Sequence, residues 1–331
     1  MTNNNARESK GAFKGLPLPV VGILMMAIAA AAFSVMHAII RYVSVEVHPF
    51  EIAFFRAGVG ILALMPIFLK DGFGTLKTTK LKLYTYRGAI NAVAMLMFFY
   101  SLSITPLATV AALGFTAPVF ATMLAMFFLG EKVGIRRWSA IIFGFIGTLV
   151  ILRPGVIEIG FGPLLVLGSS LVWAVALMII KVLTRTESSV SITAYAYFFL
   201  TPICLIASLP HWTWPSLEKL AWLAVVAVIG TIAQTAMNKA LQLGDASTVL
   251  PVDFTKLLWA AAIGAVLFGE MPDMFTWIGG GMIFASATYI GIREARLKRA
   301  GKLPPGPHAT PVGRDPAVDV PEVIDDKSRN P

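Results

Sequence analysis

Ten long apolar stretches alternate with short polar ones along most of this chain. A helix needs about 20 mainly apolar residues to cross the hydrocarbon core of a bilayer, and each stretch approaches that length. Charged residues, prolines or glycines bound the stretches on both sides. The pattern predicts an all-α integral membrane protein with ten transmembrane helices. The predicted spans are residues 18–40, 50–69, 88–104, 108–129, 138–152, 162–180, 192–209, 220–237, 246–268 and 275–290.

Composition supports a chain embedded in a membrane. Apolar residues make up 57% of the 331 residues and charged residues only 14%, which is too little charge to solvate a soluble surface. The formal net charge of +9 comes from short basic runs between apolar stretches, so we expect no nucleic-acid partner. The single cysteine, Cys204, and four scattered histidines predict neither a disulfide nor a metal site, and no cofactor is expected.

Basic residues are distributed unequally between the two sides of the predicted bundle. Short cytoplasmic loops of membrane proteins are enriched in Lys and Arg. Placing residues 1–17 in the cytoplasm predicts that the C-terminal tail, residues 300–331, also lies there; its prolines and mixed charge predict disorder. The basic residues then assigned to the cytoplasm are Arg7, Lys10, Lys14, Lys70, Lys77, Lys80, Lys82, Arg87, Lys132, Arg136, Arg137, Lys181, Arg185, Lys239, Arg293, Arg296, Lys298 and Arg299, against Arg41, Arg153 and Lys219 on the other side.

The two halves of the chain are similar in sequence. Residues 101–131 align without a gap on residues 240–270. Each half holds five predicted helices, and an odd number of spans places the two copies in opposite orientations. Such an inverted repeat is typical of secondary transporters, in which a site between the halves opens alternately to either side. The register is fixed by three matches, Phe115 with Phe254, Gly130-Glu131 with Gly269-Glu270, and Trp138 with Trp277.

These paired motifs resemble the drug/metabolite transporter superfamily, and within it the ten-helix group with two EamA domains. The resemblance implies a first EamA repeat at 18–152, a second at 162–292, and a place in a bacterial inner membrane. One departure is that Leu257 stands in the second copy where the first has Pro118. The run LPVDFTKLLWAAAIGAVLFGE is similar to a bacterial subgroup whose known members include carriers of riboflavin and S-adenosylmethionine.

Two charged residues, Asp253 and Lys256, lie within the ninth predicted span. A charge at the bilayer centre costs about 2.5–3.5 kcal/mol on insertion scales, and residues three apart on a helix are within reach of each other. We therefore expect an ion pair. The pair either opens to bind a polar or zwitterionic substrate or stays closed as a structural pair, and Asp253 is a candidate to carry a coupling proton.

Three further side chains have both a functional and a structural interpretation. Trp259, one turn after Lys256, would stack on an aromatic substrate or pack at a helix interface. Arg56 follows Glu51 by five residues, which favours an ion pair or snorkelling toward the outer interface over binding of a substrate carboxylate or phosphate. His37 would shuttle protons or, as we favour, form a hydrogen bond between helices.

Uncharged polar and aromatic residues within the spans complete the candidate cavity. Each of them would contact substrate or join two helices by a hydrogen bond. They are Asn91, Tyr100, Trp173, Gln234 and Asn238.

Glycines and prolines predict where helices end, bend or approach closely. The two Gly-Glu motifs stand at helix ends, where glycine caps a helix and a carboxylate accepts a backbone hydrogen bond. Gly144, Gly147 and Gly279 permit close helix packing. Pro118 and Pro251 interrupt backbone hydrogen bonding within their spans, which either exposes carbonyls to a cavity or only kinks the helix.

Three classes of function are compatible with a bundle of this kind. Secondary transport explains the inverted repeat, the short loops and the charges within the spans together. An intramembrane enzyme would need a nucleophile with a base, and neither Gly-x-Ser-x-Gly nor His-Glu-x-x-His occurs; a scaffold without transport would not need the Asp253–Lys256 pair. The expected partners are the bilayer and a small organic metabolite, with riboflavin first and S-adenosylmethionine or an amino-acid-like metabolite as alternatives. The direction of transport and a homodimer stay open.

Overall fold

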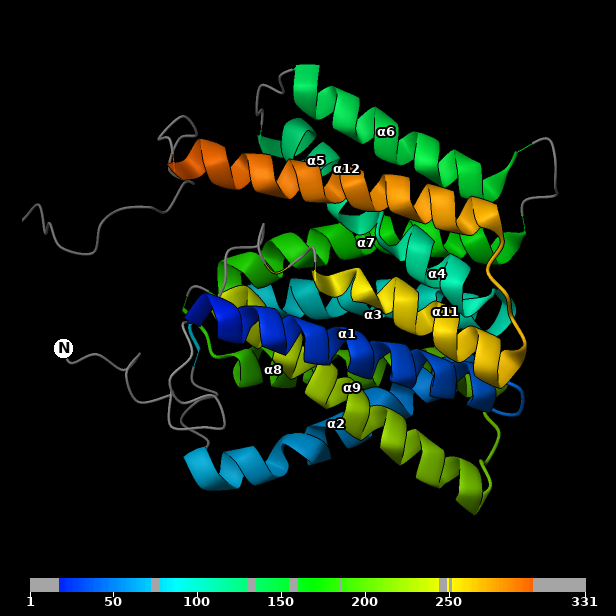
Figure 1. Ribbon diagram of the computed structural model, residues 1–331. Helices are drawn as coiled ribbons and strands as arrows, with labels where there is room; N and C mark the ends of the chain where they lie inside the picture. The colour runs from blue at the N-terminus through cyan, green and yellow to red at the C-terminus, as the bar shows by residue number, and fades with distance from the viewer. Residues whose placement is uncertain are drawn as a thin grey trace, which may run out of the picture.

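The computed structural model describes residues 18–299 except 73–77, 130–134, 155–159, 185, 244–248 and 250–251, and this part of the chain is helical (Figure 1). The predicted all-α fold is confirmed. The termini that the sequence assigned to the cytoplasm lie outside the described residues. The helices are α1 (Leu18–Val43), α2 (Pro49–Asp71), α3 (Leu81–Ile104), α4 (Leu107–Gly114), α5 (Ala117–Leu129), α6 (Ile135–Leu152), α7 (Phe161–Leu183), α8 (Ser189–Ser208), a short 3-10 helix η3 (Leu209–His211), α9 (Leu217–Leu243), α11 (Thr255–Phe268) and α12 (Met274–Arg299).

Each of the ten predicted spans corresponds to an apolar helical segment. Six helices (α1, α2, α3, α7, α8 and α9) are long and apolar enough to cross a membrane. Four shorter apolar segments, 107–121, 138–152, 255–268 and 274–290, coincide with the remaining predicted spans. Long apolar runs identify these elements because a helix is the backbone conformation that satisfies its own hydrogen bonds in lipid.

The two halves run in opposite directions through the bundle. In Figure 1, α1 starts at the left of the molecule and α7 starts at the right, so equivalent helices of the halves are antiparallel. The helix α1 begins and α12 ends at the same end of the bundle, which we call the first end. The other end, where α1 finishes, is called the opposite end.

Helix packing shows the same internal symmetry. The repeat pairs α1 with α7, α2 with α8, α3 with α9, α5 with α11 and α6 with α12. When each helix is exchanged for its equivalent, the α1–α9 contact becomes α7–α3 and the α2–α9 contact becomes α8–α3, and both of these contacts are present. The contact of α1 with α11 has its counterpart in α5–α7. Two further contacts, α2–α8 and α6–α12, join equivalent helices directly. The most extensive packings therefore obey the two-fold exchange expected of an inverted repeat.

Two of the predicted spans that contain a proline, the fourth and the ninth, are interrupted. Residues 108–129 form two helices, because Phe115 and Thr116 make a turn between α4 and α5. Pro118 has no N–H to donate to the carbonyl four residues back, at Gly114, which removes one helical hydrogen bond at this turn. In the second half Phe254 forms a turn directly before α11. The sequence predicted that a proline interrupts each of these spans, and breaks are present, but the long apolar run does not show that the turns fall at Phe115 and Phe254.

The two breaks meet inside the bundle. The rings of Phe115 and Phe254 pack with their centroids 4.0 Å apart. These are the residues that the repeat alignment superposes, so the approximate symmetry axis passes close to this ring pair. Pro251, the proline of the second span, lies outside the described residues.

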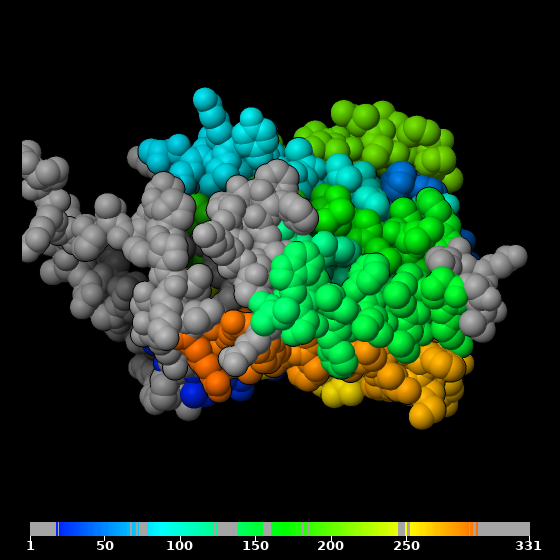
Figure 2. All heavy atoms as spheres, turned by 90° about the horizontal axis from the view of Figure 1, so that it is seen from above, coloured from blue at the N-terminus to red at the C-terminus, as the bar shows by residue number. Residues whose placement is uncertain are grey.

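Glycines bring α6 and α12 together, as expected. A Cβ atom added to Gly147 would lie 2.7 Å from the carbonyl oxygen of Gly279, which is closer than side chains pack. Seen from above in Figure 2, α6 (green) and α12 (orange) lie on the same face of the molecule. The outward side chains of α6 are apolar: Ile142, Phe143 and Phe145 are 53%, 43% and 55% exposed. Such a surface suits lipid.

Candidate substrate-binding site

A cavity of about 210 Å³ lies between the two halves. Its lining comes from α1, α2, α3, α4 and α5 of the first half and from α7, α9, α11 and α12 of the second. Typical small-molecule pockets have about 300–1,000 Å³, so a large metabolite requires the walls to move apart. Seven of the ten predicted substrate-binding residues line this cavity, namely His37, Arg56, Asn91, Trp173, Gln234, Asp253 and Lys256.

The expected ion pair between Asp253 and Lys256 is present. Asp253 lies two residues before α11 and Lys256 lies in its first turn. Lys256 Nζ is 2.6 Å from Asp253 Oδ1. Their side chains are 21% and 18% exposed. The ammonium of Lys256 also lies 4.6 Å from the centre of the Phe33 ring, which adds a cation–π contact from α1. The pair is thus placed at the break in the ninth span and joins the two halves at the cavity wall.

Arg56 does not have the role expected for it. It lies in the cavity wall with 5% of its surface exposed, so it does not reach an outer interface. Glu51 accepts hydrogen bonds from the backbone N–H and the hydroxyl of Thr213 instead, at 2.9 and 3.3 Å. Positions five apart on a helix point about 140° away from each other, so Glu51 and Arg56 face different neighbours.

Aromatic rings form much of the remaining wall. His37 packs against Phe98 and Phe33, with ring centroids 5.0 and 6.0 Å apart. No hydrogen bond of His37 occurs among the described residues, so the interhelical bond expected for it is not observed there. Phe115 and Phe254 also line the cavity. These two phenylalanines were not among the predicted site residues, although their equivalent positions in the two repeats were a signal for a site shared by the halves.

Gln234 and Asn238 separate into two roles. Gln234 lines the cavity and donates from Nε2 to Asn238 Oδ1 at 3.4 Å. Asn238 is fully buried outside the lining and donates to Thr193 Oγ1 at 3.0 Å, which joins α9 to α8. Asn238 therefore supports Gln234 and the helix packing, and it does not face the cavity.

Two aromatic candidates lie away from the cavity. Trp259 is 48% exposed and is not part of the lining, whereas its neighbour Ala260 is. Adjacent helical residues point about 100° apart, so α11 turns Trp259 outward when Lys256 and Ala260 face inward. Tyr100 packs near His48 and Phe50 at the opposite end, with ring centroids 6.1 Å from each. Among the tryptophans singled out, Trp173 on α7 is the one that the structure brings to the cavity.

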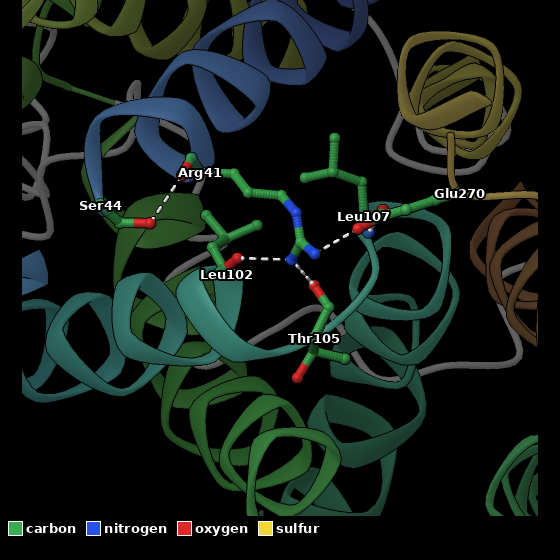
Figure 3. Close-up of polar contacts among 6 residues, drawn as sticks. All are labelled: Arg41, Ser44, Leu102, Thr105, Leu107 and Glu270. Atoms are coloured by element: carbon green, nitrogen blue, oxygen red, sulfur yellow. Dashed lines mark hydrogen bonds and ion pairs between the residues drawn. The ribbon is translucent and has the colours of Figure 1, made fainter. Parts of the chain in front are cut away.

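A polar network closes the bundle at the opposite end (Figure 3). Arg41 at the end of α1 forms an ion pair with Glu270, which follows α11. The Arg41 guanidinium also donates to the carbonyl oxygens of Leu102 and Thr105, where α3 ends. Glu270 Oε2 accepts from the backbone N–H of Leu107 at the start of α4, at 3.0 Å. We call this network the Arg41–Glu270 bridge; it joins α1, α3 and α4 of the first half to the second half.

The Gly-Glu motif of the second half has the structural role expected from the sequence. Gly269 adopts a left-handed conformation, with φ 66° and ψ 17°, at the end of α11. That turn aims the next residue, Glu270, at α4 and Arg41. Gly130 and Glu131, the equivalent motif of the first half, lie outside the described residues.

A second ion pair lies near the bridge. Arg153 contacts Asp273 at 2.6 Å, and Asp273 Oδ1 accepts from the backbone N–H of Thr276 in the first turn of α12 at 2.8 Å. Partial burial alone would raise the pKa of the Asp273 carboxyl, but the hydrogen bonds from Thr276 and the positive charge of Arg153 outweigh it and lower that pKa. Asp273 therefore stays ionised and fixes the start of α12.

Comparison with known proteins agrees with this geometry. The model of the EamA-like transporter family matches residues 20–153 and 160–292. A riboflavin transporter of Vibrio cholerae is 29% identical, covering 85% of this chain and 96% of the relative. A riboflavin transporter of Rhizobium johnstonii is 30% identical, covering 85% and 94%. An S-adenosylmethionine uptake transporter of Rickettsia bellii is 28% identical, covering 86% and 97%.

The fold is also known from experiment. One crystal structure superposes with a TM-score of 0.58 at 15% sequence identity, covering 85% of this chain and 97% of the other. That similarity concerns the fold alone, whereas the family match extends over both halves. The chain therefore belongs to the EamA-like transporter family of the drug/metabolite transporter superfamily, a family of membrane transporters and not of enzymes.

Proposed function

We propose that this protein is a secondary transporter that moves riboflavin across a bacterial inner membrane by alternating access. The observation that carries the proposal is the cavity between two antiparallel halves, with aromatic walls and the Asp253–Lys256 pair at its edge. The repeats 18–152 and 162–292 are the two bodies that move against each other. The Arg41–Glu270 bridge holds the opposite end closed, so substrate enters or leaves there only after this bridge opens.

The chemistry of the walls supports a flat substrate with a polar edge. Trp173 and the neighbouring phenylalanines offer ring faces for stacking, whereas Lys256, Gln234 and Asn91 offer hydrogen bonds. Riboflavin has a planar ring system and a hydroxylated chain, which fits both kinds of wall. Two of the relatives described above are riboflavin transporters.

S-adenosylmethionine is the second candidate, and one relative supports it directly. Its sulfonium carries a positive charge, for which Asp253 is the natural partner in the cavity. Binding would then require the Asp253–Lys256 pair to open. Asp253 is also the carboxylate that we propose as the carrier of a coupling proton.

Substitution of the cavity tryptophan distinguishes these substrates. In a strain that neither makes nor imports riboflavin, we expect the wild-type protein to restore uptake of labelled riboflavin. Trp173→Ala should raise the apparent KM about tenfold, since aromatic stacking with its buried area is worth about 1–2 kcal/mol. Asp253→Asn should have the smaller effect on riboflavin, and the order of the two variants should reverse for S-adenosylmethionine.

Trp259→Ala is the matched control, because Trp259 lies outside the cavity lining. It should leave the KM for riboflavin close to that of the wild type. A KM raised by Trp259→Ala and unchanged by Trp173→Ala would move the site away from the cavity. Absence of riboflavin uptake by the wild type at normal membrane abundance would refute the substrate assignment.

Orientation in the membrane is a separate proposal. The structure places the start of α1 and the end of α12 at the same end, and the excess of Lys and Arg there favours the cytoplasm. A reporter active only in the periplasm should be silent when fused after Arg299 and active when fused after Arg153. The reverse pattern would invert the proposed orientation.

A further inference from the structure

The guanidinium of Arg56 lies in the cavity wall without an acidic partner. Its Nε donates to Met36 Sδ at 3.3 Å and its Nη1 to Met95 Sδ at 3.0 Å. Thioether sulfur is a weak acceptor, and a guanidinium has five N–H donors. Within the described residues no carboxylate lies at ion-pair distance from Arg56. The residue is only 5% exposed, so little of the guanidinium is open to water at the protein surface.

The surroundings of Arg56 hold its position but supply no strong acceptor. The guanidinium carbon lies 5.7 Å from the Phe99 ring centre and 5.5 Å from that of Tyr197, which are cation–π distances. On α9, a Cβ added to Gly230 would lie 2.8 Å from Arg56 Nε, so glycine leaves room for the side chain. Four helices, α1, α3, α8 and α9, thus surround a cation whose hydrogen-bond acceptors among the described residues are thioethers.

The charge balance of the lining leaves Arg56 as the cation without an acid. Lys256 is neutralised by Asp253 at 2.6 Å, and Arg56 and Lys256 are the Lys and Arg residues among the described lining. A ligand that brings a hydrogen-bond acceptor to a cation in an apolar wall strongly stabilises that cation. The planar guanidinium suits an acceptor with two oxygen or nitrogen atoms side by side.

We propose that Arg56 binds the hydrogen-bond acceptor group of the transported substrate and thereby determines specificity. This inference rests on the proposed transport function and names the part of the substrate that is recognised. In riboflavin the acceptor is the carbonyl-bearing pyrimidine edge of the ring system, and in S-adenosylmethionine it is the carboxylate. Stacking on Trp173 and pairing with Arg56 then hold the face and the edge of one planar group.

Paired substrates that differ in the acceptor test this role. 2-Thioriboflavin replaces one carbonyl oxygen by sulfur, a weaker acceptor. We expect the wild type to prefer riboflavin over 2-thioriboflavin in kcat/KM by about ten- to hundredfold, the size of a hydrogen bond to a charged group. Arg56→Gln should lose this preference, and Arg56→Lys should retain part of it. The ratio between the two substrates cancels any loss of protein, and comparing that ratio between the wild type and Arg56→Gln removes the effect of the larger sulfur atom that both proteins share.

Arg153→Gln is the matched control, because Arg153 is paired with Asp273 and does not line the cavity. It should keep the wild-type preference. If Arg56→Gln also keeps it while transporting riboflavin, Arg56 does not bind the acceptor, although the transport function stands.

Failure of the proposed substrate would show in the wild type instead. If the wild type takes up S-adenosylmethionine and not riboflavin, decarboxylated S-adenosylmethionine becomes the paired substrate. The wild type should then discriminate against the analogue that lacks the carboxylate, and Arg56→Gln should not. Equal discrimination by both proteins would overturn the inference for this substrate as well.

Discussion

Lys256→Ala is expected to abolish uptake while the protein still reaches the membrane. The substitution removes the ammonium 2.6 Å from Asp253 and leaves a carboxylate that is only 21% exposed without its partner. An unpaired buried charge of this kind costs about 3–5 kcal/mol, which corresponds to a loss of transport of more than about a hundredfold. The measurement is initial uptake, divided by the amount of protein in the membrane.

A double variant separates the two contributions of Lys256. Asp253→Asn combined with Lys256→Gln removes both charges and leaves no unpaired ion. It should recover membrane abundance and thermal stability in detergent relative to Lys256→Ala, but transport should stay low if the pair contacts substrate. Wild-type uptake by Lys256→Ala at normal abundance would show that the charge is neither a ligand nor a required partner.

Glu270→Gln should weaken closure at the opposite end of the bundle. The carboxylate contacts both Arg41 and the backbone N–H of Leu107, so its loss weakens two charge-assisted bonds. Such bonds contribute about 1.5–3 kcal/mol each, and a shift of about 1.4 kcal/mol already changes the ratio of two conformations tenfold. Transport should fall, because a carrier held in one conformation completes fewer cycles.

Labelling of a cysteine in the cavity measures this shift directly. Ala111 of α4 lines the cavity, and Cys204 is buried and free, so Ala111→Cys in a Cys204→Ser background gives one reactive site. A maleimide that does not cross membranes, added on the side of Arg41, should label this site faster in Glu270→Gln. Glu187→Gln removes a carboxylate that contacts Thr78 and Tyr84 at the first end and should not have this effect. Unchanged labelling and transport in Glu270→Gln would contradict a closing role for the bridge.

The ten spans and the repeat could be predicted because both depend on local sequence. A run of apolar residues is enough to identify a helix that crosses lipid, and a fixed offset between similar segments identifies the repeat. The Asp253–Lys256 ion pair could also be predicted from local sequence, because side chains three positions apart on a helix are neighbours. The prolines predicted an interruption within two spans, but the turns at Phe115 and Phe254 were not located, because an apolar run continues through them.

The rest of the site depends on contacts between distant segments. The surroundings of Arg56 come from α1, α3, α8 and α9, and the only local candidate, Glu51, points elsewhere. For Trp259 the sequence favoured stacking on a substrate and packing at a helix interface equally, because the spacing from Lys256 does not reveal which face of α11 points inward. Glu270 was read correctly as a helix-end residue, but its ion pair with Arg41 requires the two halves to be placed together.

The two-fold exchange of helix contacts also constrains the energetics of the transport cycle. If the halves exchange conformations, the most extensive helix packings form again between equivalent helices, so we expect the two states of the carrier to lie close in free energy. The difference that remains comes from positions at which the halves differ in sequence, such as Pro118 against Leu257 and Ala117 against Lys256. The resting bias of the empty carrier is therefore encoded in a small set of unmatched residues, and making the halves more alike should bring its equilibrium constant toward one.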